Sequence, residues 1–220
     1  MKQKEPQRTP SRRDALETRE KLLTQAGKAF AKQGFEGANL RDICKSAEVN
    51  LGAVKYYFGS KKELYREALI KPHIEMMREE LPPRFDEAPT PEIALKNWIS
   101  FFMRFILVRR RKHPYLSRLM IRELVNPSFA LDELIQTIFK EVRSQLIMIL
   151  SRMTDIDHED RGIGELANMI ILLCTQQEMG REVFERFGYS PPATEKEVAT
   201  LAEKIYRFAH SGIHTWSFET

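Results

Sequence analysis

The sequence predicts an all-α fold. Apolar residues recur at helical spacing from residue 14 to the C-terminus, and no stretch alternates apolar and polar residues as a half-buried strand would. Proline and glycine divide this pattern into segments of helical length, with clear breaks at 82–91, 113–114, 126–127 and 190–192. We therefore expect about nine or ten helices that pack on one another.

The N-terminal end is expected to hold a basic arm followed by a helix. Residues 1–13 contain two prolines and no periodic apolar face, which is typical of a flexible arm. From Asp14 the apolar positions share one helical face, and Gly34 is placed to end that helix.

Two short predicted helices come next, separated by three or four residues. Asn39 is suited to cap the first, and the second runs from Leu51 to Phe58. Together they form a predicted helix-turn-helix at about 39–58. Val54 and Phe58 lie four apart, so the second helix can bury one face and leave the other for a partner. Eight residues at ~1.5 Å each make it about 12 Å long, which suits the major groove of DNA.

The remaining two-thirds of the chain is also predicted to be helical. A fourth helix begins near Lys61, and Pro72 should end or kink it near Lys71 because proline lacks the backbone donor. A further helical stretch is expected from Pro72 to Glu80. Beyond the proline-rich loop, long helices are predicted at about 91–112, 114–125, 128–152, 159–187 and 195–216.

Charge is distributed unevenly along the chain. The net charge of +4 combines 16 Lys and Arg against 9 Asp and Glu in residues 1–71 with 19 against 22 in residues 72–220. A basic first third and a mildly acidic remainder suggest that the first part meets a polyanion and that the second does something else. A solvated basic tail is the alternative, because five of the cations precede Asp14.

Composition excludes several classes of protein. Hydrophobic residues make up 42% and charged residues 30%, which fits a folded globular chain. Cys44 and Cys174 cannot form a disulfide framework, and we expect both to be buried packing residues. No apolar run is long enough to span a bilayer and no secretory signal is present, so a cytoplasmic protein without a membrane partner is expected.

No pattern in the chain indicates a cofactor, a catalytic site or a metal site. His210 and His214 lie four apart on one predicted helix, a spacing that can bind metal, but no acidic or thiol partner lies near them in the sequence. We therefore expect no metal, no cofactor and no enzymatic activity.

The stretch from Thr18 to Leu69 resembles the N-terminal domain of the TetR/AcrR family of bacterial transcription regulators. The shared marks are Gly-Phe at 34–35, Leu-Arg-Asp-Ile at 40–43, the AVKYYF run at 53–58 and Ser-Lys-Lys-Glu-Leu at 60–64. The resemblance implies an arm at 1–13, a helix-turn-helix DNA-binding domain at 14–71, and a helical effector-binding and dimerisation domain at 72–220.

The resemblance also implies DNA contacts of two kinds. The groove and its base edges would meet Arg41, Leu51, Gly52, Ala53 and Lys55, and the sugar-phosphate backbone would meet Asn39, Tyr56, Tyr57 and Lys61.

Two positions of the motif depart from the family pattern. Glu48 stands where the family usually has glycine in the turn, which makes the turn less easy and puts a negative charge near DNA. Asn39 replaces the common Thr or Ser but is still a good cap.

The C-terminal helices carry less family information. Residues 113–128 are similar to a subgroup with an Arg-Glu-x-x-Asn-Pro pattern, which does not name an effector. Aromatic and methionine side chains on these helices are candidates for lining an apolar effector cavity, although most must be core. The candidates are Trp98, Phe101, Phe102, Phe105, Met120, Phe139, Met148, Met169 and Phe184.

The sequence therefore predicts a ligand-responsive transcription regulator, most simply a repressor that releases operator DNA when an unidentified small molecule binds. A homodimer is expected through the helices at 159–187 and 195–216, because these helices carry more apolar residues than one small domain can bury, and because a two-fold dimer matches an operator with two half-sites. The apolar residues are Leu166, Met169, Ile170, Leu173, Ile205, Phe208 and Trp216. The alternatives are a small helical enzyme that uses the C-terminal cavity and a nonspecific architectural DNA-binding protein.

Overall fold

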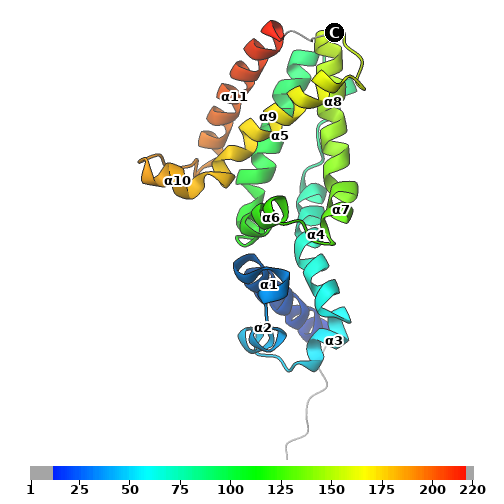
Figure 1. The fold of residues 1–220 in the computed structure, drawn as a ribbon, viewed down its shortest axis with the longest axis vertical. Helices are drawn as coiled ribbons and strands as arrows, with labels where there is room; N and C mark the ends of the chain where they lie inside the picture. The colour runs from blue at the N-terminus through cyan, green and yellow to red at the C-terminus, as the bar shows by residue number, and fades with distance from the viewer. Residues whose placement is uncertain (1–11, 217–220) are drawn as a thin grey trace, which may run out of the picture. The chain divides into compact units, whose positions relative to one another are not determined.

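The structure is a computed structural model that describes residues 12–216, apart from the side chains of residues 109 and 110. Every regular element in this range is helical, which confirms the predicted all-α class (Figure 1). In chain order the elements are α1 (Arg12–Gly37), α2 (Leu40–Ala47), α3 (Gly52–Phe58), α4 (Lys61–Glu79), η1 (Phe85–Glu87), α5 (Pro91–Leu107), η2 (Arg109–Lys112), α6 (Leu116–Val125), α7 (Leu131–Leu134), η3 (Ile135–Phe139), α8 (Lys140–Thr154), α9 (Arg161–Met179), α10 (Arg181–Arg186) and α11 (Glu195–Thr215).

The chain divides into two compact units. The first contains the described residues up to Lys71 together with Arg118–Ala130. The second contains Pro72–Ser117 and the described residues from Leu131 onward. The sequence-based division also falls between residues 71 and 72, but it assigned residues 118–130 to the C-terminal domain.

The first unit is built around one apolar core. Phe30 of α1 and Tyr65 of α4 meet at its centre, with ring centroids 4.8 Å apart in an edge-to-face contact. Around this pair the first four helices bury Leu22, Leu23 and Ala26 of α1, Ile43, Cys44 and Ala47 of α2, Val54 and Phe58 of α3, and Leu64, Ala68 and Leu69 of α4.

The boundaries of α1 differ slightly from the prediction at one end and agree at the other. The helix begins at Arg12 rather than Asp14, and residues 1–11 of the predicted arm lie outside the described range. Gly34 has φ 75° and ψ 178°, so the regular helix breaks there as predicted. Glycine occupies this left-handed region without the steric cost that a Cβ would bring.

Pro72 does not end α4, which continues to Glu79. Of the two expectations for this position, an end or a kink near Lys71, the end is therefore wrong, whereas the helical stretch expected after Pro72 is confirmed. Proline removes one backbone hydrogen bond from a helix interior at a cost of about 3 kcal/mol. Burial on both sides of Pro72 offsets this cost, because Leu69, Ile70, His73 and Met76 are all buried.

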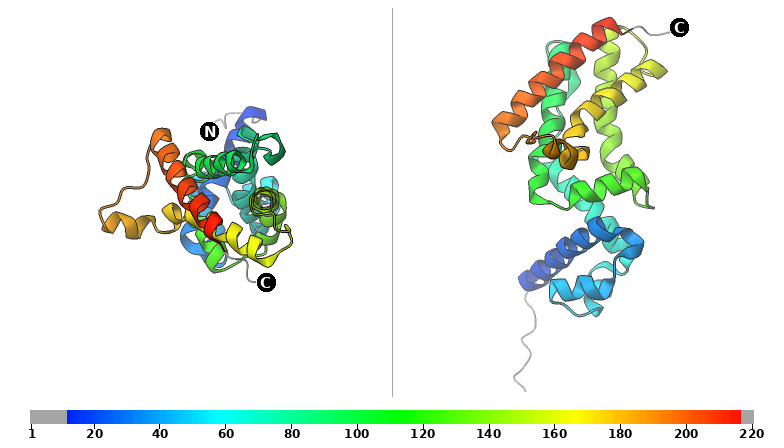
Figure 2. Two further views of the ribbon diagram at one scale, coloured as in Figure 1. Left: turned by 90° about the horizontal axis from the view of Figure 1, so that it is seen from above. Right: turned by 60° about the vertical axis from the view of Figure 1, so that its left-hand side comes forward.

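In the second unit α5 contacts α8, α9 and α11, and Figure 2 shows α11 running beside α5. Trp98 of α5 is fully buried, and its indole N–H donates to the carbonyl of Val142 on α8 at 3.0 Å. A buried indole needs such a partner for its one donor. The hydrogen bond therefore fixes α5 against α8 at the middle of the unit.

Three predicted helices of this unit are interrupted. The one expected at 91–112 ends at Leu107 and is followed by the short η2. The one expected at 128–152 begins at Leu131 and contains the π-helical turn η3. The one expected at 159–187 ends at Met179, where Gly180 separates α9 from α10. The apolar spacing was read as continuous across these breaks, and at the first of them the run Arg109–Lys112 contains no apolar residue.

The N-terminus of α11 generates a prediction about stability. Thr194 accepts a hydrogen bond from the N–H of Glu197, and the Glu197 carboxylate accepts from the N–H of Thr194, which is a complete capping box. We expect Thr194→Ala to lower the free energy of unfolding by ~1 kcal/mol in chemical denaturation. Thr200→Ala, an exposed change within the same helix, is the matched control and should cost less than about 0.5 kcal/mol. Equal losses would contradict the capping role.

Candidate nucleic-acid interface

The helix-turn-helix consists of α2, a turn at residues 48–51, and α3. Asn39 caps α2, and its side chain accepts a hydrogen bond from the N–H of Arg41 at 2.8 Å. At α3 the N-cap residue Leu51 makes no side-chain hydrogen bond, but Asn50 just before it accepts from the N–H of Ala53 at 3.1 Å. Helix α3 begins at Gly52, one residue later than predicted. An asparagine side chain therefore accepts from a backbone N–H in the first turn of each helix.

Helix α3 has one buried face and one exposed face. Val54 and Phe58 are buried, as their spacing predicts. On the other side Leu51 is 48% exposed and Tyr56 is 80% exposed. Large side chains in water at the start and middle of a short helix are available to a partner.

The nine residues predicted to contact DNA all lie in the first unit, and none is buried. The exposed ones are Asn39, Arg41, Leu51, Gly52, Lys55 and Tyr56, and the half-buried ones are Ala53, Tyr57 and Lys61. All nine side chains or backbones are thus accessible to a partner, and their contact with DNA stays a prediction.

Lys61, at the start of α4, has a defined position on the first unit. Its ammonium group donates to the carbonyl of Glu36 at 3.2 Å and lies 4.9 Å from the centroid of the Phe35 ring. Both contacts come from the end of α1, so a cation–π contact and a hydrogen bond place this charge beside the motif.

Glu48 in the turn has the conformation that a glycine would favour. Its φ is 57° and its ψ is 40°, and its N–H bonds to the carbonyls at the end of α2. Its carboxylate pairs with Lys21 of α1, which lowers the pKa of that carboxyl through a hydrogen bond and through charge. The negative charge that the sequence places near DNA is thus paired with a cation.

Ion pairs that the sequence analysis missed fasten α1 to the rest of the unit. Arg19 pairs with Glu67 of α4 and lies 4.8 Å over the ring of Phe58 at the end of α3. Lys71 of α4 pairs with Glu20. The partners lie far apart in the chain, so local spacing carries no signal for these pairs.

The residues predicted to line an effector cavity differ in burial and in the unit to which they belong. Trp98, Phe101, Phe102 and Phe105 are buried on α5, whereas Met169 is 46% exposed on α9. Met120 belongs to the first unit and the others to the second. The half-buried members are Met120, Phe139, Met148 and Phe184.

A buried histidine joins two of these candidates. His73 of α4 is 3% exposed, and its ring centroid lies 6.2 Å from that of Phe105 and 5.7 Å from that of Phe139. Phe139 ends the π-helical turn η3, an irregularity that often occurs at functional sites. The sequence pattern did not single out His73, because its ring partners lie more than 30 positions away in the chain.

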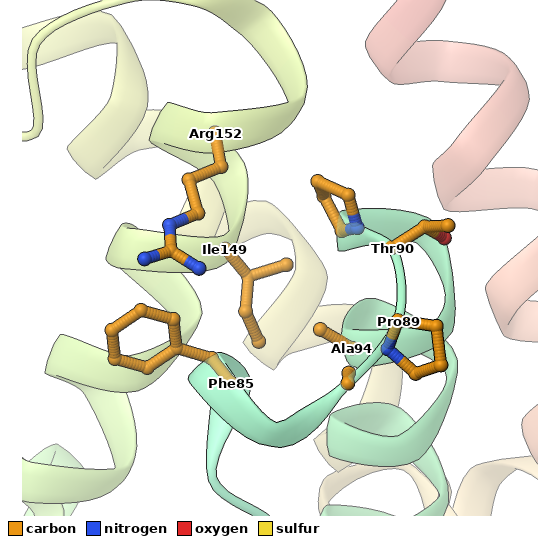
Figure 3. A pocket seen from close by; sticks show the side chains of 8 residues that line it. Phe85, Pro89, Thr90, Ala94, Ile149 and Arg152 are labelled. Carbon is orange, nitrogen blue, oxygen red and sulfur yellow. The ribbon is translucent and has the colours of Figure 1, made fainter.

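A small pocket of about 90 Å³ lies elsewhere in the second unit. In Figure 3 Phe85 and Arg152 form one side of it and Pro89, Thr90 and Ala94 the other. The guanidinium of Arg152 lies 4.6 Å over the Phe85 ring. None of the predicted effector residues lines this pocket, which is far smaller than the ~300–1,000 Å³ of typical ligand sites.

Other candidate chemistry is limited in the described range. Both cysteines are buried free thiols, as predicted, and burial raises the pKa of Cys174 to about 12. His210 and His214 face each other with their Nε2 atoms 3.2 Å apart. Among residues 12–216 no three His, Cys, Asp or Glu side chains gather as a metal site would require. No helix in that range has the length and apolar character to cross a bilayer.

Comparison with known families gives two matches that together cover most of the chain. Residues 22–68 match the family described as bacterial regulatory proteins of the tetR family. Residues 91–213, more than half of the chain, match the C-terminal domain of the HTH-type transcriptional dual regulator CecR.

Several named proteins are similar to this chain. The HTH-type transcriptional repressor NicS of Pseudomonas putida is 31% identical over 106 residues, which is 48% of each chain. The dual regulator CecR of Shigella flexneri is 26% identical over 153 residues, 66% of this chain and 68% of that one. The chain spans about half the length of the curated relatives NicS, YttP and AcnR.

Solved structures show the same fold. HlyIIR, a hemolysin II transcriptional regulator, superposes with a TM-score of 0.59 at 22% identity, over 88% of this chain and 97% of that one. The regulator FadR from Bacillus subtilis, in complex with stearoyl-CoA, gives a TM-score of 0.59 at 19% identity, over 88% and 98%.

The backbone of Glu48 generates a second prediction. Glu48→Gly and Glu48→Ala both remove the carboxylate, so the difference between them isolates the left-handed conformation. We expect the glycine variant to be more stable by about 1 kcal/mol in chemical denaturation.

Ser46, an exposed residue inside α2, is the control position. There glycine should be less stable than alanine by about 1 kcal/mol, the opposite sign, because the backbone is helical. The same sign at both positions would refute the explanation.

Proposed function

We propose, on the premise that this chain belongs to the TetR family of bacterial transcription regulators, that it is a DNA-binding repressor controlled by a small molecule. The observation that carries the proposal is the exposed face of α3, a seven-residue helix anchored by only Val54 and Phe58. A protein that regulates bacterial operators would work in the cytoplasm, where the DNA is.

The proposed contacts divide between affinity and specificity. Arg41 and Lys55 are the candidates for base edges, and an arginine suits guanine through a bidentate pair. Leu51, Gly52 and Ala53 give α3 a slim start that allows close approach to the groove. Contacts from Asn39, Tyr56, Tyr57 and Lys61 to phosphates would position the motif without reading sequence.

We place the effector in the second unit, at the buried cluster of His73, Phe105 and Phe139. Two of these were candidates from the sequence, and η3 adds a backbone irregularity next to them. Repression would be relieved if the effector binds the DNA-incompetent state more tightly. DNA must then weaken effector binding by the same factor.

The two alternatives have less support. A small helical enzyme would need a catalytic constellation, and the family and its named relatives are regulators. A nonspecific architectural protein would bind operator and bulk DNA alike, which the experiment below measures.

We further propose that the protein is a homodimer through α9 and α11. Met169 and Leu172 on α9 and Phe208 on α11 are 46%, 56% and 69% exposed. Leu166, Ile170 and Ile205, which also suggested this interface in the sequence, are buried inside the unit and do not contribute to an outer face. An apolar strip on two long helices is typical of an isologous contact.

The test of the function begins with footprinting of the DNA next to the protein's own gene to find an operator. Arg41→Ala and Lys61→Ala are then titrated against that operator and a random duplex at several salt concentrations. We expect Arg41→Ala to cost ~1–3 kcal/mol on the operator and much less on random DNA. Lys61→Ala should weaken both equally and reduce the salt slope by about one. Equal losses for Arg41→Ala on both duplexes would move Arg41 to the backbone class, and equal wild-type affinity for both would support the architectural alternative.

The dimer is tested by sedimentation velocity at micromolar concentration. We expect wild type to sediment as a dimer and Phe208→Glu to shift it to monomer, because the change buries a charge in the interface. Leu81→Glu is the matched control, since Leu81 is 74% exposed and lies outside both helices. A wild-type monomer would contradict the proposal.

A further inference from the structure

Glu123 of α6 is a carboxylate buried in the first unit, with only 1% of its surface exposed. It accepts a hydrogen bond from the hydroxyl of Tyr65 on α4. Its Oε2 also accepts from the backbone N–H and from the hydroxyl of Ser128, each at 3.0 Å. Burying a carboxylate destabilises a protein unless such donors surround it. The hydrogen bonds to Glu123 therefore constrain the positions of Tyr65 and Ser128.

The first consequence is the position of the loop that follows α6. Ser128 is held by Glu123, and its hydroxyl also accepts from the N–H of Ala130 at 3.1 Å. Between them, the ring of Phe129 lies 5.7 Å from Tyr65 and 5.1 Å from Phe35, measured between centroids. Phe35, Tyr65 and Phe129 thus form an aromatic cluster whose last member is fixed through Glu123.

This aromatic cluster carries two lysines. The ammonium group of Lys61 lies 4.9 Å from the centroid of Phe35, and that of Lys62 lies 4.6 Å from the centroid of Phe129. Both lysines begin α4 directly after the helix-turn-helix. Their charges therefore take their positions from rings that Glu123 helps to hold.

A second contact joins the same segment to α1. At Gly34 an added Cβ would lie 2.8 Å from a guanidinium nitrogen of Arg122, so the Arg122 side chain approaches the backbone of α1 closely at this residue. Arg122 and Glu123 are neighbours on α6, and they reach the end of α1 and the side of α4 respectively. Residues 118–130 are thus fastened to both helices that flank the motif.

We propose that Glu123 is a positioning residue for DNA binding. By fixing Ser128 and Tyr65, it sets the rings beneath Lys61 and Lys62 and so orients both ammonium groups toward DNA phosphates. The inference rests on the proposed function and extends it to a segment far along the chain from the motif. Because phosphate contacts carry no sequence information, loss of Glu123 should weaken binding to all DNA alike.

The test uses Glu123→Gln and Phe129→Leu in the full chain, with binding measured on operator and random duplex at several salt concentrations. Thermal unfolding is followed in parallel, and binding is measured where every variant is folded. We expect about a ten-fold loss on both duplexes for each variant, an unchanged ratio between them, and a salt slope smaller by up to about two. The double variant should lose no more than either single one, because Glu123 acts through Phe129.

Glu178→Gln is the matched control, since Glu178 is 9% exposed in the second unit and pairs with Arg181 at 2.9 Å. It should leave DNA affinity and salt slope unchanged.

Three results would overturn the inference. Glu123→Gln could lower the unfolding temperature without changing DNA affinity or salt slope. Glu178→Gln could reproduce the effect of Glu123→Gln, or the losses of the two single variants could add in the double variant. If Glu123→Gln does not fold, Phe129→Leu alone decides, and unchanged DNA binding by that variant overturns the inference. A wild-type protein that binds neither duplex would instead overturn the proposed function itself.

Discussion

The first unit depends on one constraint: a helix as short as α3 is not stable on its own. Helix α3 has seven residues, and isolated helices of fewer than about 12–15 residues are marginal in water. Only Val54 and Phe58 anchor it, so its stability comes from what surrounds these two side chains. The core of α1, α2 and α4 supplies that support, and the side chain of Asn50 accepts from the N–H of Ala53 in the first turn. One face of α3 stays exposed because the other helices of the unit supply most of the buried core.

Polar contacts on the surface of the first unit also help to hold α3 and the turn before it. Arg19 contacts both Phe58 and Glu67, so one side chain of α1 touches the end of α3 and the side of α4. Exposed ion pairs usually contribute less than about 1 kcal/mol each, and their value here is geometric. Glu48 adopts a left-handed backbone conformation, which lowers stability, and its carboxylate forms an ion pair with Lys21. The turn is therefore held from α1 as well as from the motif.

Local patterns in the sequence were sufficient to predict the elements of the motif. Apolar spacing predicted the burial of Val54 and Phe58, Gly34 predicted the break in α1, and Asn39 predicted a cap. The expectation that Pro72 could end the helix was wrong, because the sequence shows the local cost of a proline but not the burial around it. The contact between Tyr65 and Glu123 joins residues 58 positions apart, and periodicity contains no information at that distance. The sequence thus predicts which face of a helix is buried, but not which distant segment covers it.

The two units share helices rather than a simple linker. Helix α4 runs through the boundary between Lys71 and Pro72, and α6 runs through that between Ser117 and Arg118. On α4, Tyr65 belongs to the first unit and His73 to the second, two turns apart on one continuous helix. A ligand changes a distant equilibrium only by its differential affinity for two states. A ligand at His73 would therefore act on DNA binding if its preferred state changes the part of α4 or α6 that Tyr65 and Glu123 hold together.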